Sequence, residues 1–341
     1  MRDTNTNHDP IRVQLYQRKP ASLLFSLERV FEAVRKALPA DISAETHSCP
    51  FESRHLLKRI LNIVDAKFHQ RDINHIVGDV HYLAFSLKKS KTILTIHDCV
   101  SLRLSKGLHR VVLLWFWFRL PVRRVAAITV ISDSTRDEVV NYTGCDAKIM
   151  RVISCPVPSG FVAWPKEFCA ERPAILQVGT ALHNKNICRV AEALRGIPCR
   201  LDVIGRLTEQ QREVLECNRI QYTEQWNLSD QQVIEKYREC DMVVFASIYE
   251  GFGMPIIEAN ATGRPVVTSN IGPMPGVAGL AACLVDPFDS SSIREGIVRV
   301  IEDADYRNCL VAQGYENVKR FQADVIAAQY ADLYREVFLD C

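Results

Sequence analysis

The fold is decided by the stretch Glu250-Gly251-Phe252-Gly253-Met254-Pro255-Ile256-Ile257-Glu258. It follows the apolar run 241–247, which we expect to be a strand buried on both faces. Pro255 suits the first turn of a helix, where a backbone N–H would have no intrahelical partner. A glycine-rich turn between a buried strand and a helix N-terminus is typical of a parallel α/β sheet, in which ligands bind at the carboxyl ends of the strands.

The same stretch carries two acids separated by glycines. The amides and partial positive charge of a helix N-terminus suit a phosphate or sugar oxygen, and the glycines allow close approach of the backbone. Glu250 and Glu258 can then face one cleft and accept hydrogen bonds from the paired hydroxyls of a sugar or ribose. Composition alone leaves it equally open that Glu250 is an exposed turn residue and Glu258 a partner of the helix dipole.

Outward from this stretch, the C-terminal half alternates short apolar runs with segments of helical period, which predicts a parallel sheet covered by helices. The predicted strands are 174–179, 200–205, 220–223, 241–247, 265–269 and 282–286. The predicted helices are 187–195, 208–217, 229–240, 254–262 and 291–301. Thr208 and Ser229 are residues that commonly cap helix N-termini.

The N-terminal half repeats this pattern less clearly and predicts a second, smaller α/β layer, with apolar stretches at 73–77, 92–96, 128–132 and 148–154. Prolines and a glycine interrupt regular structure between the two halves. We therefore predict an N-terminal domain at 1–155, a linker at 156–172 and a C-terminal domain at 173–322. The final segment, 323–341, has helical spacing and is predicted to cross back to the N-terminal domain.

Composition sets the outer bounds. A chain of 341 residues that is 48% hydrophobic has enough apolar material for two cores. The 42 basic and 40 acidic residues give a net charge of +2, which does not suggest nucleic-acid binding. The 12 cysteines are scattered, without the C-x-x-C spacing of a zinc or redox site. Unpaired thiols, a polar N-terminus and the absence of a long apolar run predict a cytoplasmic protein.

The two acids, with Gly-Phe-Gly-Met-Pro between them, resemble the signature of retaining glycosyltransferases of family 4, which have the GT-B fold. The similarity continues through 258–269 and closes at 277–279 and 284–287. It also includes Gln177-Val178-Gly179-Thr180, Lys185-Asn186 and Thr95-Ile96-His97-Asp98, and so extends over roughly residues 73–338.

This resemblance implies two Rossmann-like domains facing each other across a cleft, the N-terminal one for the acceptor and the C-terminal one for the donor. The implied reaction moves a hexose from a nucleotide-diphosphate sugar, GDP-mannose or a UDP-sugar, to a saccharide or lipid-linked acceptor. Such a reaction belongs to cell-surface polysaccharide or glycolipid biosynthesis. Family members of this fold generally need no metal, so we expect neither a metal nor a cofactor besides the donor.

The resemblance also assigns roles to residues. Glu258 would hold the ribose hydroxyls and Glu250 would contact the donor sugar, with the amides of Phe252, Gly253 and Met254 around the sugar and diphosphate. Lys185 would neutralise the diphosphate beside Gly179 and Thr180 as negative charge develops on the leaving group. His97, at the end of a predicted strand, would lie over the donor sugar and assist the incoming hydroxyl.

One position departs from the family pattern. Many relatives carry an arginine where this chain has Thr180, which removes one expected phosphate-binding cation. Arg206, after the predicted strand 200–205, is our hypothesis for a substitute, although an arginine at a strand end is as often a surface residue. The acid pair at Asp303 and Asp305 follows a predicted helix, and we interpret it as a solvated helix end rather than a metal site.

The segment 103–124 has an aromatic and aliphatic centre, 111–118, flanked by cations. Aromatics beside cations suit a membrane interface, which predicts peripheral attachment to an anionic inner membrane face. A core helix of the N-terminal domain explains the same run equally well.

Two other functions fit parts of the sequence. One is a non-catalytic sugar-nucleotide-binding subunit, which the intact set of acids, lysine and histidine disfavours. The other is a same-fold sugar-nucleotide epimerase, which needs differently placed acids.

Overall fold

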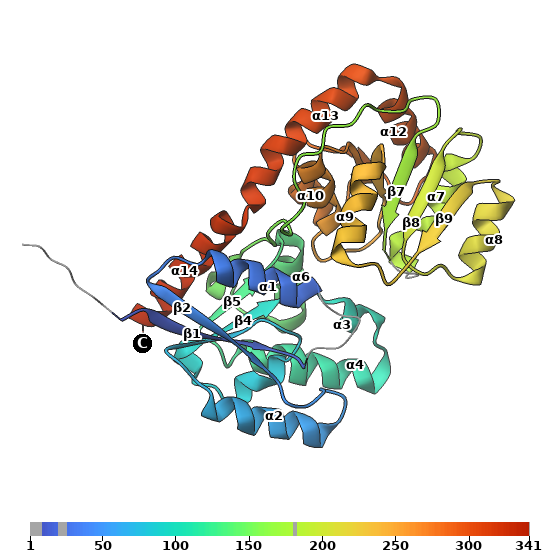
Figure 1. Cartoon of the computed structure of the whole chain (residues 1–341). Coiled ribbons are helices and arrows are strands. Elements are labelled where there is room, and N and C mark those ends of the chain that lie inside the picture. Colours follow the sequence, from blue (N-terminus) through green and yellow to red (C-terminus); the bar gives the residue numbers. More distant parts are fainter. Residues whose placement is uncertain (1–8, 20–25, 180–182, 341) are drawn as a thin grey trace, which may run out of the picture. The chain divides into compact units, whose positions relative to one another are not determined.

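The computed structural model describes residues 9–19, 26–179 and 183–340, with only the backbone of Ser26 and Leu27. These residues form two compact units (Figure 1). Unit 1 comprises Met1–Pro156 and Ala323–Cys341, and unit 2 comprises Val157–Gln322. Each unit is built on one six-stranded sheet in which every neighbouring pair of strands is parallel. The fold is therefore the α/β class that the alternation of elements predicts.

Unit 2 has the strand order β12-β11-β10-β7-β8-β9. Its strands are β7 (Ala174–Val178), β8 (Arg200–Ile204), β9 (Gln221–Gln225), β10 (Met242–Phe245), β11 (Val266–Ser269) and β12 (Cys283–Val285). Its α-helices are α7 (Ile187–Leu194), α8 (Glu209–Cys217), α9 (Asp230–Glu239), α10 (Met254–Thr262), α11 (Met274–Ala278), α12 (Ser290–Glu302) and α13 (Ala304–Asn317), with short 3₁₀ turns at His183–Lys185 and Val318–Phe321. Thr208 and Ser229 cap α8 and α9 in reciprocal capping boxes, as their residue types predict.

Unit 1 has the strand order β2-β1-β3-β4-β5-β6. Its strands are β1 (Ile11–Gln17), β2 (Ile42–Ser48), β3 (Ile73–Ile76), β4 (Thr92–Ile96), β5 (Ala127–Val130) and β6 (Met150–Val152). Its α-helices are α1 (Ser26–Ala37), α2 (Leu56–Phe68), α3 (Val100–Leu104), α4 (Gly107–Leu113), α5 (Leu120–Val122), α6 (Asp133–Thr143) and α14 (Ala323–Leu339), and it has a π-helix at Leu114–Arg119 and 3₁₀ turns at His81–Phe85, Lys89–Lys91 and Ala147–Ile149.

Strands β1 and β2 are not among the apolar runs that indicate strands in the sequence. Strand β2 lies at the edge of the sheet, where one side is unpaired, and most of its side chains are half-buried or exposed. An edge strand therefore reads as polar, because only part of it contacts the core. Unit 1 has as many strands as unit 2, so the prediction of a smaller N-terminal layer does not hold for the sheet.

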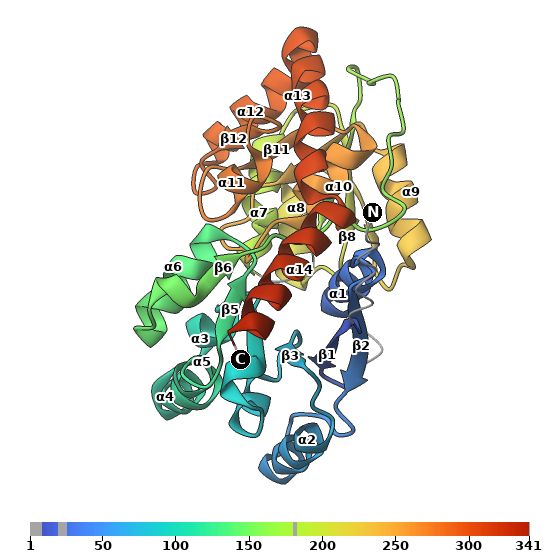
Figure 2. The ribbon, with the colours of Figure 1, turned by 90° about the vertical axis from the view of Figure 1, so that its left-hand side faces the viewer.

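Helix α14 completes the core of unit 1 although it lies at the far end of the chain. Its apolar face packs with α1 and the sheet, as Figures 1 and 2 show. His75 on β3 is fully buried, and burial lowers its pKa to about 3, so its imidazole is neutral. Its Nδ1 lies 2.8 Å from the Tyr334 hydroxyl of α14, and its Nε2 lies 2.7 Å from Thr95 Oγ1. This network fixes how α14 docks on the sheet.

The substitution Tyr334→Phe is expected to lower the free energy of unfolding by about 1–3 kcal/mol, because it leaves a buried imidazole nitrogen without its partner. Equilibrium unfolding in urea measures the loss. Tyr222→Phe, which removes the hydroxyl of a half-buried ring on β9, is the control and is expected to change stability by less than about 0.5 kcal/mol. Equal stability of Tyr334→Phe and wild type would contradict the assigned role.

The segment 103–124 is mostly helical, and part of it lies in the core of unit 1, as the prediction of a core helix implies. Trp117 and Phe118 belong to the core of unit 1, whereas Leu108 and Phe116 are exposed. Among the described residues, no helix combines the length and apolar character that spanning a membrane requires. The segment therefore contributes to the core and still presents an apolar surface.

Candidate functional site

The candidate site lies where the strand order of unit 2 reverses. Strands β7 and β10 are parallel neighbours at this switch point, so the loops after them meet. The backbone N–H of Ile248 donates to the Asn184 carbonyl at 2.8 Å, and Asn184 Nδ2 donates to the Tyr249 carbonyl at 2.9 Å. The buried Asn186 side chain donates to the Ala246 carbonyl at 2.9 Å. These bonds hold the two loops together.

The paired loops bring Lys185 and Glu250 into contact. Lys185 Nζ lies 2.7 Å from Glu250 Oε1, and both side chains are mostly buried, with exposed fractions of 16% and 15%. The aliphatic part of Lys185 packs on Gly179, whose φ is +147° and whose Cβ, if present, would lie 2.6 Å from Lys185 Cδ. Only glycine fits both this backbone conformation and this contact. The lysine is thus directed toward the glycine-rich turn.

The turn itself ends at the N-terminus of α10. Gly253 precedes the first helical residue with φ +115°, and Pro255 lies in the first turn, as its position in the sequence predicts. Phe252 is buried and packs edge-on against Phe321, which anchors the turn. Met254 begins the helix. The turn therefore presents the N-terminal end of a helix dipole beside the Lys185–Glu250 pair, an arrangement that suits an anionic ligand.

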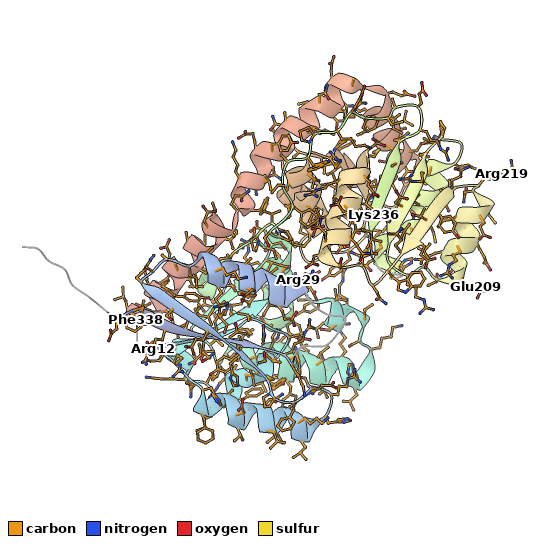
Figure 3. All side chains as sticks on the ribbon, in the orientation of Figure 1. Arg12, Arg29, Glu209, Arg219, Lys236 and Phe338 are labelled. Carbon is orange, nitrogen blue, oxygen red and sulfur yellow. The ribbon has the colours of Figure 1, made fainter. Side chains whose placement is uncertain are left out.

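Glu258 lies one helical turn further along α10 and has a partner that the sequence analysis missed. The hydroxyl of Tyr237, a fully buried residue of α9, donates to Glu258 Oε2 at 2.5 Å. Lys236, labelled in Figure 3, marks α9 and immediately precedes this tyrosine. Burial raises the pKa of Glu258 to about 7, while the Tyr237 hydrogen bond and the charge of Lys185 oppose the rise. No local signal identifies Tyr237, because α9 and α10 meet only in the folded chain.

We expect Tyr237→Phe to raise the donor KM roughly tenfold and to move the apparent pKa of Glu258 further above 7, because the carboxylate loses the hydrogen bond that stabilises its charged form. The pH profile of the donor KM measures both effects. Tyr222→Phe on β9 is the matched control. A purely structural role for Tyr237 would lower stability without moving the pH profile, and that result would contradict the prediction.

His97 follows β4 in unit 1 and is buried. Its Nε2 lies 2.9 Å from the Val77 carbonyl, which requires the hydrogen on Nε2, and its Nδ1 has no hydrogen-bond partner among the described residues. The edge of the Phe31 ring contacts the imidazole. Burial lowers the pKa of His97, so the ring is neutral and Nδ1 carries a lone pair. This nitrogen can accept a proton or a hydroxyl hydrogen.

Of the three further buried side-chain atoms without partners among the described residues, two lie at the ends of strands in unit 2 and the third is Arg238 Nε. The two at strand ends are Ser247 Oγ, just after β10, and Gln177 Oε1, on β7. Buried polar groups are rarely left unpaired without a reason, and one such reason is that a ligand supplies the hydrogen-bond partner when it binds. Ser247 was not identified by the sequence analysis, since a serine at a strand end carries no specific signal.

The other predicted residues, Arg206, Thr180 and Asp303, are not shown in contact with this cluster. Arg206 is exposed, and its guanidinium lies 5.9 Å from the centre of the Trp226 ring, so its role as a substitute cation stays a prediction. Thr180 lies outside the described residues. Asp303 caps α13, accepting the Tyr306 N–H at 2.9 Å, which agrees with its interpretation as a helix end. In unit 2 the structure thus gathers Gly179, Lys185, the 250–254 turn and Glu258, but does not add Arg206 to their contacts.

Comparisons with known proteins identify the family. A family model described as "Glycosyltransferase Family 4" matches residues 7–160, and one described as "Glycosyl transferases group 1" matches residues 164–317. The two models together match all of the chain from residue 7 to residue 317 except 161–163. The chain belongs to glycosyltransferase family 4.

Relatives of this family 4 chain include two proteins of Escherichia coli. The chain is 25% identical over 233 residues to the O-antigen chain mannosyltransferase B. This match covers 61% of the chain and 60% of that protein. The chain is 27% identical over 223 residues to the serotype-specific mannosyltransferase WbdA, covering 58% of the chain and 27% of that protein. The match therefore spans less than two thirds of the length of either relative.

Among solved structures, the family 4 chain resembles Anabaena Alr3699/HepE, determined in complex with UDP and glucose. The TM-score is 0.73 at 16% sequence identity, and the match covers 96% of this chain and 100% of the other. At this identity the likeness establishes the fold, which is GT-B with two Rossmann-like units. The GT-B fold implied by the family resemblance is thereby confirmed.

Proposed function

We propose that this chain is a retaining glycosyltransferase that moves a hexose from a nucleotide-diphosphate sugar to a saccharide or lipid-linked acceptor. The observation that carries the proposal is the Lys185–Glu250 pair at the switch point, beside the N-terminus of α10 and one helical turn from Glu258. A cation, helix amides and two carboxylates match the diphosphate and hydroxyl groups of such a donor.

In this proposal the donor replaces contacts that the residues make with one another. The diphosphate replaces Glu250 as the ion-pair partner of Lys185 and lies against the α10 amides. The Glu250 carboxylate can then accept hydrogen bonds from the sugar. Glu258, held by Tyr237, accepts the ribose hydroxyls. As the bond from the anomeric carbon to the diphosphate oxygen breaks, Lys185 stabilises the developing negative charge. The acceptor oxygen forms its bond to the anomeric carbon on the same face, and its proton passes to the departing diphosphate oxygen.

The relatives guide the choice of donor and pathway. Both E. coli proteins are named as mannosyltransferases, one of them for an O-antigen chain, which favours GDP-mannose and a cell-surface polysaccharide. The Anabaena structure contains UDP and glucose, which keeps UDP-glucose as the second candidate. We propose GDP-mannose as the first donor to test and expect no metal requirement in transfer.

A panel of nucleotide sugars tests the proposal by thermal unfolding. A donor at about 100 times its Kd adds roughly 2.7 kcal/mol to the stability of the folded state, which raises the unfolding midpoint by several degrees. Lys185→Met is the control, and its midpoint should respond much less. An assay with radiolabelled donor then distinguishes the candidate functions. Transfer of label to an acceptor fraction identifies a glycosyltransferase, whereas a non-catalytic binding subunit transfers none. Release of an epimer of the donor sugar would identify an epimerase. The proposal would be refuted if no nucleotide sugar in the panel raised the unfolding midpoint.

We further propose that unit 1 attaches peripherally to the inner face of an anionic membrane. Exposed apolar side chains follow one another on α3, α4 and the π-helix, with Leu108 79% and Phe116 55% exposed. Helix α2 carries a second exposed row that the sequence analysis missed, consisting of Leu57, Ile60, Leu61, Val64 and Phe68. The Arg59 guanidinium of α2 lies 4.9 Å from the centre of the Trp117 ring, so the two helical regions are in contact. Apolar rows flanked by cations suit a headgroup interface.

The double substitution Leu108→Ser with Phe116→Ser is expected to weaken binding to anionic vesicles at least tenfold, because it removes two side chains that would be buried among lipids. Co-sedimentation with vesicles containing phosphatidylglycerol measures the bound fraction. Leu280→Ser in unit 2, which removes an equally exposed leucine, is the matched control and should bind as wild type does. Unchanged binding of the double variant, or no binding by wild type, would exclude this attachment.

A further inference from the structure

Unit 1 contains a cluster of metal-ligating side chains on strand β2 and helix α2, outside the donor site. His47 lies near the end of β2, Asp65 lies in the last turn of α2, and His69 directly follows that helix. Asp65 and His69 are four residues apart, and their side chains approach each other on one face at the end of the helix. The edge position of β2 leaves His47 beside this face.

The ligating atoms of the three residues converge. His47 Nε2 lies 2.6 Å from Asp65 Oδ2, and His69 Nδ1 lies 3.5 Å from the other carboxylate oxygen, Oδ1. One ligating atom from each residue can be chosen so that all three lie within 4.8 Å of one another. Ligands about 2.0–2.1 Å from a tetrahedral ion are themselves about 3.4 Å apart. To bind one ion, the 2.6 Å pair must therefore separate and any pair as far apart as 4.8 Å must approach, by side-chain movements on the order of 1 Å.

Contacts with neighbouring groups keep the three side chains close together. The imidazoles of His47 and His69 stack with their centres 4.3 Å apart, and the edge of the Tyr16 ring contacts His47. The Tyr16 hydroxyl donates to the Ala66 carbonyl at 3.1 Å, which ties the end of α2 to the sheet. His69 Nδ1 also lies 2.8 Å from the Asp65 carbonyl, so binding of an ion at Nδ1 must replace that contact.

From this geometry we propose that His47, Asp65 and His69 form a binding site for a divalent transition-metal ion, of which Zn²⁺ fits best. Two imidazole nitrogens and one carboxylate oxygen are a zinc donor set, and water completes the tetrahedron. The His69 side chain is 48% exposed, which gives water and the ion access. The nearby cation Arg71 lies 3.6 Å from Glu45, which offsets its charge.

The ion would join the edge strand β2 to α2 and so fix the helix that carries an exposed apolar row. The site uses no residue assigned to the donor, and the proposal holds whether or not the chain transfers sugars. The ordinary alternative is a His47–Asp65 hydrogen bond that links strand and helix without an ion.

Zinc titration of the full-length, EDTA-stripped chain tests the proposal. We expect one equivalent to bind by calorimetry and the unfolding midpoint to rise with zinc concentration. His47→Gln and His69→Gln should each weaken zinc binding at least tenfold and abolish the rise in the midpoint. His109→Gln, which removes an exposed histidine of α4, is the control and should bind zinc as wild type does.

Cobalt distinguishes these ligands from the 12 cysteines of the chain and needs no substituted protein. Co²⁺ at the proposed site should give visible d–d bands without the near-ultraviolet charge-transfer band of thiolate ligands. The proposal is overturned if that thiolate band accompanies the single equivalent, if wild type binds no zinc, or if both histidine variants bind zinc as tightly as wild type.

Discussion

Lys185→Met is expected to reduce kcat for sugar transfer by roughly 10²–10³, because the leaving diphosphate loses the cation that stabilises its developing charge. Methionine keeps the apolar stem that packs on Gly179, so the loops should retain their arrangement. Glu250 loses its ion-pair partner in the unliganded protein, and a mostly buried carboxylate without a partner lowers stability. Single-turnover assays at saturating donor measure the chemical step directly.

Two comparisons sharpen this prediction. Lys319→Met removes the lysine of a surface pair with Glu316 that is about two-thirds exposed on both sides, and kcat should not change. Adding Glu250→Gln to Lys185→Met should restore stability without restoring transfer, because the uncompensated charge disappears while the phosphate-binding cation is still missing. A kcat for Lys185→Met within about threefold of wild type would show that the lysine has no part in leaving-group stabilisation.

Glu258→Gln is expected to weaken donor binding by about 10², since a carboxylate that accepts two ribose hydroxyls becomes an amide that can accept only through its oxygen. The same substitution should stabilise the unliganded protein at pH 8 by on the order of 1–2 kcal/mol. Burial raises the pKa of Glu258 from 4.5 to about 7, so the charged form is disfavoured in the folded state. Calorimetric donor titration and urea unfolding measure the two opposite effects.

Glu258 makes the stability of the chain and its affinity for the donor depend on pH in opposite directions. Between pH 4.5 and about 7 the folded chain holds a proton on Glu258 that the unfolded chain has lost, so this group favours folding most at low pH. That contribution is lost as the pH rises through 7. Donor binding, which needs the carboxylate, should instead weaken up to tenfold per pH unit below 7. Glu258→Gln should remove both dependences, and a variant that keeps the wild-type pH profile would assign the titration to another group.

The C-terminal half could be predicted closely because its signals are local. Continuous apolar runs such as β10 and β11 indicate strands covered on both faces, and capping residues such as Thr208 and Ser229 mark where helices begin. The donor motif is equally local, since the glycine turn, Pro255 and the acids lie within one strand–turn–helix unit. Strand β2 escaped prediction, because a partly exposed edge lacks the continuous apolar run of a central strand. Strand β1 lies inside the sheet, but the polar residues Arg12, Gln14 and Gln17 interrupt its apolar run.

By itself, the sequence determined the α/β class, the family and the residue types of the donor motif, because each depends on neighbours in the chain. The tertiary structure alone decided which groups meet: Lys185 with Glu250 across the switch point, Tyr237 with Glu258 between two helices, and His75 with Tyr334 of α14. It also decided protonation, since burial raises the pKa of Glu258 and lowers that of His97. Both outcomes depend on packing between distant segments, which spacing along the chain does not encode.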